Sequence, residues 1–68
     1  MEETAFNEVM RNIVAAIRSV GHDPYNQLIS YLETGHDCYI TRTGNARSMI
    51  RLLDKRQIMQ YVLKMYNR

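Results

Sequence analysis

Side chains that bind metals or act as nucleophiles stand together at one place in the sequence, residues 36–38. They are His36, Asp37 and Cys38. A tetrahedral metal site needs four ligands that converge on one ion, and adjacent residues rarely do so. The other histidine is His22, and no second cluster of histidine and cysteine completes a set of ligands. The pattern therefore indicates a polar loop, and we assign no metal site and no cofactor.

The same stretch lacks the groups that a catalytic centre needs. A nucleophilic Cys38 paired with His36 would need a third group that orients the base, together with donors that stabilise an oxyanion. No residue of the sequence can be named for either role. The three glycines stand apart from one another, whereas a phosphate-binding loop groups several glycines together. We therefore assign no catalytic residue and predict that the protein is not an enzyme.

Positive charge is concentrated in the second half of the chain, although the net charge is only +2. Its basic residues are Arg42, Arg47, Arg51, Lys55, Arg56, Lys64 and Arg68. Arg47 and Arg51 are four residues apart, so on a helix they would share a face, as in a helix-turn-helix regulator that reads DNA. A small net charge and the lack of a basic arm argue against DNA. The pattern favours a protein contact or a solvated surface, with DNA binding through these two arginines as the alternative.

Length and cysteine content narrow the class of protein. The 68 residues are expected to form a single helical domain, residues 1–68, near the lower size limit for a self-sufficient core. One cysteine excludes an intrachain disulfide, which suits a reducing cytoplasm. No apolar run approaches the ~20 residues of a membrane span, and the start of the chain lacks the basic residues of a signal peptide. We therefore expect a cytoplasmic protein that does not bind membranes.

Hydrophobic periodicity predicts an all-α fold, a compact bundle of about four helices. The predicted helices cover residues 4–20, 24–34, 46–53 and 55–67, and residues 36–44 form an ordered loop. In the first helix, apolar residues at steps of three and four form one continuous stripe, and Thr4 is the expected N-cap. The last two helices give the second half of the chain a helix-turn-helix character.

The helices of the second half need caps and inward-facing residues. Asn45 is the expected N-cap of one helix, and Asp54 followed by Gln57 has the spacing of a capping box. This spacing favours two helices over one bent helix across residues 46–67. The residues expected to face inward from the first of them are Met49, Ile50, Leu52 and Leu53. Tyr39 and Ile40 are expected to hold the preceding loop against the core.

The stretch between Gly21 and Gly35 has clear signals at both ends of its helix. Asp23 can accept a bond from a free N–H group, Pro24 suits the first helical position, and Gly35 suits the left-handed stop. Asn26 and Gln27 are polar beyond what a cap needs, so we expect one of them to bond the loop near Tyr39–Arg42. The residues assigned to this structural motif are Gly21, Asp23, Pro24, Asn26, Gln27, Gly35 and Tyr39.

Three blocks of residues carry a family resemblance. They are Gly21-x-Asp23-Pro24-x-Asn26-Gln27-Leu28-Ile29-x-Tyr31-Leu32-x-Thr34-Gly35, Tyr39-Ile40-x-Arg42, and Ala46-Arg47-Ser48-Met49-Ile50-Arg51. In order and spacing they resemble the IreB family, also called the ReoM family, whose pattern is close to GYNPxNQIxGYLxSG, DPAYIPR and DAR-x-x-IR. The resemblance extends from about Val20 to Tyr66.

The resemblance implies a cytoplasmic regulatory protein of Gram-positive bacteria, an all-helical homodimer without enzymatic activity. It implies control of peptidoglycan precursor synthesis through Clp-dependent turnover of an enzyme, under a membrane Ser/Thr kinase that phosphorylates an N-terminal threonine. The implied partners are a second copy, a Clp protease or cell-envelope enzyme, and the kinase. Arg42, Arg47 and Arg51 recur in the family pattern and are the candidate partner-binding residues. Thr4 is the candidate phosphosite.

The sequence departs from the family pattern at several positions. The tail before the first helix is shorter, so Thr4 stands against the predicted helix start, which favours an N-cap over a phosphosite. The acidic run that opens the last helix of the family is replaced by Asp54-Lys55-Arg56-Gln57. Asp37 and Thr41 replace the loop prolines, and His22 replaces a tyrosine. These departures indicate a divergent member of the family, whose partners can differ from those of other members. A bare dimerisation module is a third hypothesis.

Overall fold

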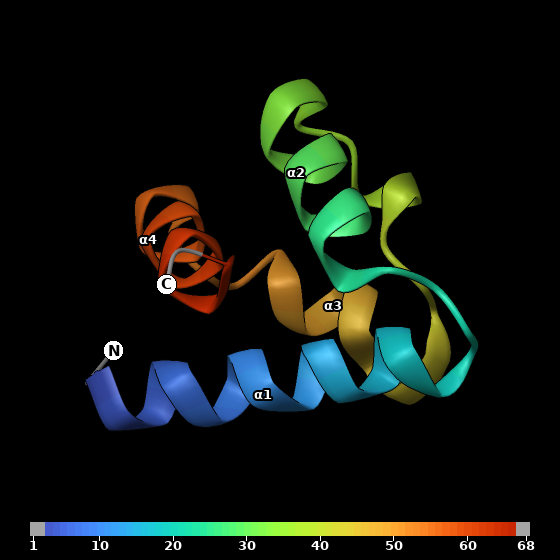
Figure 1. The fold of residues 1–68 in the computed structure, drawn as a ribbon, viewed down its shortest axis with the longest axis horizontal. Helices are drawn as coiled ribbons and strands as arrows, with labels where there is room; N and C mark the ends of the chain where they lie inside the picture. The colour runs from blue at the N-terminus through green and yellow to red at the C-terminus, as the bar shows by residue number, and fades with distance from the viewer. Residues whose placement is uncertain (1–2, 67–68) are drawn as a thin grey trace.

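The computed structural model describes residues 3–66, which form four α-helices and two single-turn 3-10 helices (Figure 1). These elements are α1 (Glu3–Ser19), α2 (Pro24–Thr34), η1 (Asp37–Tyr39), η2 (Thr43–Asn45), α3 (Ala46–Ile50) and α4 (Lys55–Tyr66). No strand occurs within the described residues. The predicted all-α fold of four helices is therefore confirmed.

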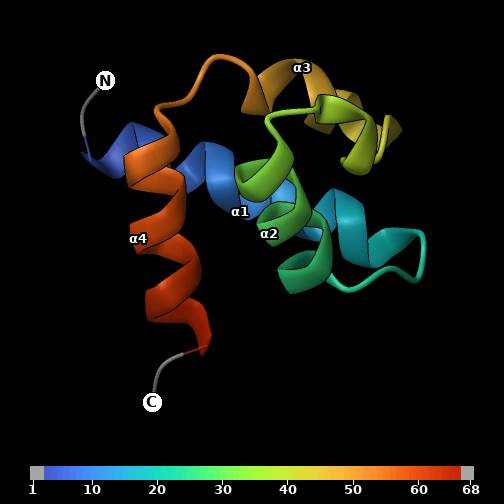
Figure 2. The ribbon, with the colours of Figure 1, turned by 90° about the horizontal axis from the view of Figure 1, so that it is seen from above.

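Helix α1 forms one side of the molecule, and the other helices pack against it (Figure 1). Helices α2 and α4 lie side by side across α1, while α3 and η2 pack along it (Figure 2). Both views place α4 at one end of the molecule and the loop with η1 and η2 at the other. The two ends therefore present separate surfaces.

The core is built around the apolar stripe of α1, as its periodicity predicts. Phe6, Met10, Ile13, Val14 and Ile17 are all buried. The other helices and the loop complete the core with Leu28, Tyr31, Ile40, Ala46, Ile50, Leu53, Ile58 and Val62. Each fully buried large apolar side chain stabilises the fold by about 1.5–3 kcal/mol relative to an exposed one. This burial explains why short helices such as α3, marginal alone, are held in place.

The ends of α1 differ slightly from the prediction. The helix already includes Glu3, so Thr4 lies within its first turn and the predicted N-cap at Thr4 is wrong. At the other end, the N–H of Gly21 donates to Arg18 O at 2.9 Å and the N–H of His22 donates to Ile17 O at 3.2 Å. These bonds form a Schellman motif around Gly21, whose φ is +79°. The helix therefore ends at Ser19.

Helix α2 begins and ends as predicted. The Tyr25 N–H donates to Asp23 Oδ1 at 3.1 Å, and Pro24 occupies the first helical position. Gly35 has a φ of +76°, and its N–H donates to Tyr31 O at 2.8 Å. All three signals are local, because each acts within a few residues of the helix end. They place α2 at Pro24–Thr34, the predicted range.

The second half forms two helices, α3 and α4, as favoured by the sequence, but α3 ends three residues earlier than predicted. Asn45 stands at the predicted N-cap position of α3, but its backbone is left-handed, with a φ of +60°, and its side chain accepts no capping bond. The Ile58 N–H donates to Asp54 O at 3.1 Å as α4 begins. The predicted last residue of α4, residue 67, lies outside the described residues.

Leu52 does not face inward, contrary to the prediction. Its side chain is 80% exposed, whereas Leu53 is buried. The N–H groups of Leu52 and Leu53 donate to the carbonyls of Met49 and Ile50, each three residues earlier. In such a tightened turn, residues three apart are eclipsed. Leu53 therefore follows buried Ile50 into the core, and Leu52 is turned toward solvent.

Across residues 3–66, none of the helices combines the length and the apolar character that crossing a membrane requires. The longest, α1, has 17 residues and a polar outer face that includes Glu8, Arg11 and Arg18. A membrane span needs about 20 predominantly apolar residues.

Candidate functional site

The loop between α2 and α3, residues 36–45, carries Arg42, is contacted by Arg47 and Arg51, and is held from both helices. From α2, the side chain of Gln27 accepts a bond at Oε1 from the Thr41 N–H at 3.0 Å. This contact confirms the prediction that Asn26 or Gln27 bonds the loop. It is partly buried, and it satisfies a backbone donor that the loop itself leaves without a partner.

From α3, Arg47 holds the same loop. Its Nε donates to Ile40 O at 3.1 Å, and its Nη2 donates to Cys38 O at 3.4 Å. A guanidinium carries several donors in a rigid fork, so one side chain can satisfy two neighbouring carbonyls. Arg47 therefore fixes the conformation of the loop, a role that its place in the sequence motif does not reveal.

Arg51, one turn further along, contacts the loop by an ion pair. Its Nε lies 3.2 Å from Asp37 Oδ2, and the two side chains are 59% and 31% exposed. An exposed pair of this kind stabilises a protein by about 0–1 kcal/mol. Most of the Arg51 guanidinium therefore stays accessible to another molecule while Asp37 fixes its position.

Ile40 is the apolar anchor of the loop, and Tyr39 is not. Ile40 is 1% exposed, but Tyr39 is 47% exposed, so the expectation that both hold the loop against the core is wrong for Tyr39. The backbone leaves η1 and becomes extended at Ile40, with a φ of −99° and a ψ of 137°. Tyr39 still belongs to the 3-10 turn of η1, so the change of backbone direction after it turns Ile40 into the core while Tyr39 stays at the surface.

Arg42 is exposed, like Arg51, but differs from the other two candidate arginines in its contacts. It precedes η2 and is exposed, and no hydrogen bond or ion pair involves its side chain within residues 3–66. The turn around it is fixed by the Asn45 N–H, which donates to Arg42 O at 3.2 Å, and by the Thr43 N–H, which donates to Thr41 Oγ1 at 3.3 Å. An ordered backbone therefore presents a free cation.

Arg42 thus lies on the loop, Arg47 on the short helix that follows it and Arg51 directly after that helix, in different states. Among residues 3–66, Arg42 has no side-chain partner, Arg51 is paired at the surface, and Arg47 is bonded to backbone. DNA reading through Arg47 and Arg51 gains no support from this arrangement. Both guanidinium groups have partners within the chain, and α3 has only 5 residues. A recognition helix needs free side chains along a longer face.

The residues that could bind a metal or act as nucleophiles are His36, Asp37 and Cys38, and they lie at and within the 3-10 turn η1. Cys38 is exposed, and Asp37 is paired with Arg51. Among residues 3–66, no three side chains of histidine, cysteine, aspartate or glutamate lie where they could hold one ion.

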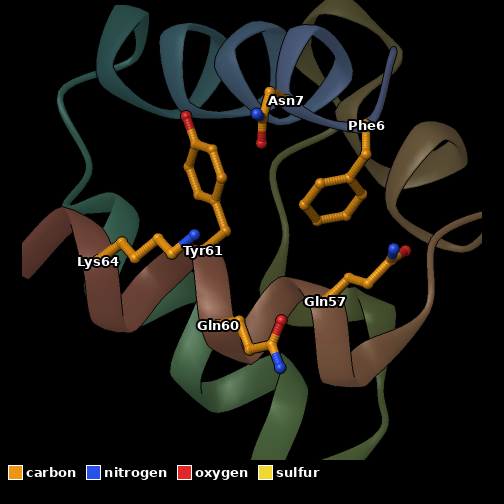
Figure 3. Close-up of a pocket in the computed structure, with 6 residues that line it drawn as sticks. All are labelled: Phe6, Asn7, Gln57, Gln60, Tyr61 and Lys64. Atoms are coloured by element: carbon orange, nitrogen blue, oxygen red, sulfur yellow. The ribbon is translucent and has the colours of Figure 1, made fainter. Parts of the chain in front are cut away.

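A second feature, which the sequence does not reveal, is a cavity of about 300 Å³ between α1 and α4. It is lined by Phe6, Asn7, Gln57, Gln60, Tyr61 and Lys64. Figure 3 shows Phe6 and Asn7 pointing from α1 toward α4, and Tyr61 pointing from α4 toward α1. The rings of Phe6 and Tyr61 meet edge to face, with centroids 6.1 Å apart. The sequence gives only an indirect sign of this cavity, which is that amide residues adjoin the aromatic ones: Asn7 follows Phe6, and Gln60 precedes Tyr61.

The fold and the loop define a small all-α protein that presents arginines on an ordered surface. The IreB family, described as the IreB regulatory phosphoprotein, matches residues 1–68. A UPF0297 protein of Ruminiclostridium cellulolyticum is 34% identical over 65 residues, which cover 96% of this chain and 74% of that protein. The chain therefore belongs to the IreB family, and the predicted resemblance is confirmed over the whole chain.

Proposed function

We propose that this IreB-family protein is a non-enzymatic adaptor that regulates other proteins by binding them, and that it acts as a cytoplasmic homodimer of one domain, residues 1–68. The family description as a regulatory phosphoprotein supports the regulatory part of the proposal. The observation that carries the binding part is the loop at residues 36–45. Gln27 and Arg47 hold this loop in one conformation. The loop carries exposed Arg42, and its Asp37 pairs with exposed Arg51 at the end of α3.

The three candidate arginines have different roles in the proposed binding. Arg42 and Arg51 contact an acidic or phosphorylated segment of the partner, because exposed guanidinium groups bind carboxylate and phosphate with two parallel bonds. Arg47 contributes by holding the loop, since its donors already serve Ile40 and Cys38. A preformed loop lowers the entropy that binding costs.

The partners proposed from the family are a Clp protease or a cell-envelope enzyme of peptidoglycan precursor synthesis, with a Ser/Thr kinase as the regulator. The kinase would phosphorylate Thr4, whose backbone lies in the first turn of α1. A phosphate there interacts favourably with the positive end of the helix dipole. The family description as a phosphoprotein supports a phosphorylation site.

Capture of partners from a lysate of the source organism tests the proposal. Tagged wild-type protein should retain at least one protein that the Arg42→Glu/Arg51→Glu variant loses, because reversed charge repels an acidic partner. The matched control is Arg11→Glu/Arg18→Glu, which makes the same charge change at exposed positions of α1. Equal retention by all three proteins would contradict the assignment of the loop.

A further inference from the structure

The outer face of α4 is basic and carries no acid. Its cations are Lys55, Arg56 and Lys64, and its sequence, KRQIMQYVLKMY, contains neither aspartate nor glutamate. Lys55 folds back onto α2, with Nζ 5.6 Å from the centroid of the Tyr31 ring. Arg56 and Lys64 are exposed, and within residues 3–66 neither is paired with an acid. Two cations of α4 are therefore available to another molecule.

The same face exposes two large apolar side chains. Met59 is 37% exposed and Leu63 is 54% exposed, while Ile58 and Val62 of the same helix are completely buried. Residues four apart on a helix are neighbours, so Met59 and Leu63 form one ridge, and Arg56 lies one turn before Met59. The cations Arg56 and Lys64 thus flank an apolar pair, Met59 and Leu63, along the solvent side of a 12-residue helix.

The cavity between α1 and α4 continues this face. Lys64 belongs both to the exposed side of α4 and to the lining of the cavity, which also holds the amides of Asn7, Gln57 and Gln60. The aromatic rings of Phe6 and Tyr61 lie between the two helices (Figure 3). None of the lining residues is acidic. The cavity therefore offers an ammonium group and amide donors to a carboxylate, next to two aromatic rings.

We propose that the outer face of α4 and the adjoining cavity bind an acidic amphipathic helix of another protein. A helix is the matching shape, because apolar groups four residues apart engage the i, i+3 and i+4 side chains of a helix laid against them. Acidic character is required by charge complementarity with Arg56 and Lys64. A glutamate of the incoming helix would enter the cavity beside Lys64, and its apolar residues would cover Met59 and Leu63.

Two other occupants fit the face less well. The α4 helix of a second copy would bring cations against cations, and the exposed face of α1 mixes Glu8 with Arg11 and Arg18. An anionic membrane would meet the cations, but it would leave the cavity and its amides unused. The face lies at the opposite end of the molecule from the loop at residues 36–45 (Figure 2). The inference therefore goes beyond the proposed function and does not depend on it.

A pair of fluorescent synthetic peptides tests this binding site. One is a leucine- and glutamate-containing amphipathic helix long enough to span α4, and the other has lysine in place of every glutamate. Fluorescence anisotropy with the full chain should show binding of the acidic peptide and none of the basic one. The Arg56→Glu/Lys64→Glu and Met59→Ser/Leu63→Ser variants should each bind about tenfold more weakly, and added salt should weaken wild-type binding.

A control variant and two further arms make the proposal falsifiable. Arg11→Glu/Arg18→Glu should change the affinity less than about twofold, because these exposed positions lie on α1 and off the α4 face. Loss of helical circular dichroism would identify an α4 variant that fails to fold, and the result then rests on the other α4 variant. Equal weakening by the Arg11→Glu/Arg18→Glu control, or no binding of the acidic peptide at millimolar concentration, would overturn the proposal.

The remaining arms identify the competing occupants. In one arm, wild-type protein binds phosphatidylserine vesicles, the α4 variants fail to bind these vesicles, and the acidic peptide does not bind the wild type. This result would make the α4 face a membrane-binding surface and would show that the proposal is wrong. If sedimentation shows that Met59→Ser/Leu63→Ser converts a dimer to a monomer, a second copy covers the face, which also overturns it. If the Arg42→Glu/Arg51→Glu variant retains every partner in the lysate capture, the proposed function is contradicted, whereas the binding site on α4 is not.

Discussion

At the scale of single residues, two polar side chains decide the shape of the loop at residues 36–45. Gln27 could be predicted as a contact to this loop, because a polar side chain beyond the first turn of α2 is not needed for capping. Arg47 could not be assigned this way, since the reach of a guanidinium to carbonyls seven and nine residues away depends on how α3 is docked. Its motif position alone suggests a surface role.

Removing the Gln27 contact should loosen the loop. Gln27→Ala leaves the partly buried Thr41 N–H without a partner and should cost about 1 kcal/mol of unfolding free energy. Hydrogen exchange at the Thr41 amide should accelerate correspondingly. The matched control is Asn26→Ala, which changes an exposed neighbour. Unchanged exchange in Gln27→Ala would show that the bond does not hold the loop.

Removing the Arg47 contacts should destabilise the protein more than removing Arg42. Arg47→Ala loses the bonds to Ile40 O and Cys38 O and should cost about 1–2 kcal/mol in urea unfolding. Arg47→Lys should recover little, because an ammonium lacks the fork that serves both carbonyls. Arg42→Ala, at an exposed position, should stay within about 0.5 kcal/mol of wild type. Equal costs at both positions would contradict the division of roles.

At the scale of elements, predictions were best where the signals are local. Both ends of α2 depend on Asp23, Pro24 and Gly35, which act on backbone within a few residues. The end of α3 could not be predicted, because the apolar pattern of Leu52 and Leu53 continues through it. Tertiary packing selected a tightened turn that buries Leu53, and hydrophobic periodicity cannot distinguish this turn from a continued helix.

The turn after α3 can be tested with two adjacent leucines. Leu53→Ala removes buried side-chain volume and should cost about 2–3 kcal/mol of unfolding free energy. Leu52→Ala, at a side chain that is 80% exposed, should change it by less than about 0.5 kcal/mol. Thermal or urea unfolding of the two variants side by side provides the measurement. The opposite ranking would mean that α3 continues as a regular helix.

At the scale of the whole molecule, the basic second half is divided between two ends. Arg42 lies on the loop at residues 36–45, Arg51 pairs with Asp37 of this loop, and Arg56 and Lys64 lie on α4. The loop and α4 lie at opposite ends of the molecule (Figures 1 and 2). The family could be recognised from the sequence, because its motif blocks coincide with α2, the loop and α3. The cavity could not, since it depends on how α1 and α4 cross. A small protein with separate basic surfaces at its two ends is suited to the proposed role of adaptor.

The central claim is that the loop at residues 36–45 is the surface that contacts a partner protein. Site-specific photocrosslinking in cells of the source organism tests it most directly. A benzophenone amino acid in place of exposed Tyr39 should form adducts with a protein other than the chain itself. The same amino acid at Ala15, exposed on α1, should not. Adducts from position 15 but not from position 39 would contradict the claim.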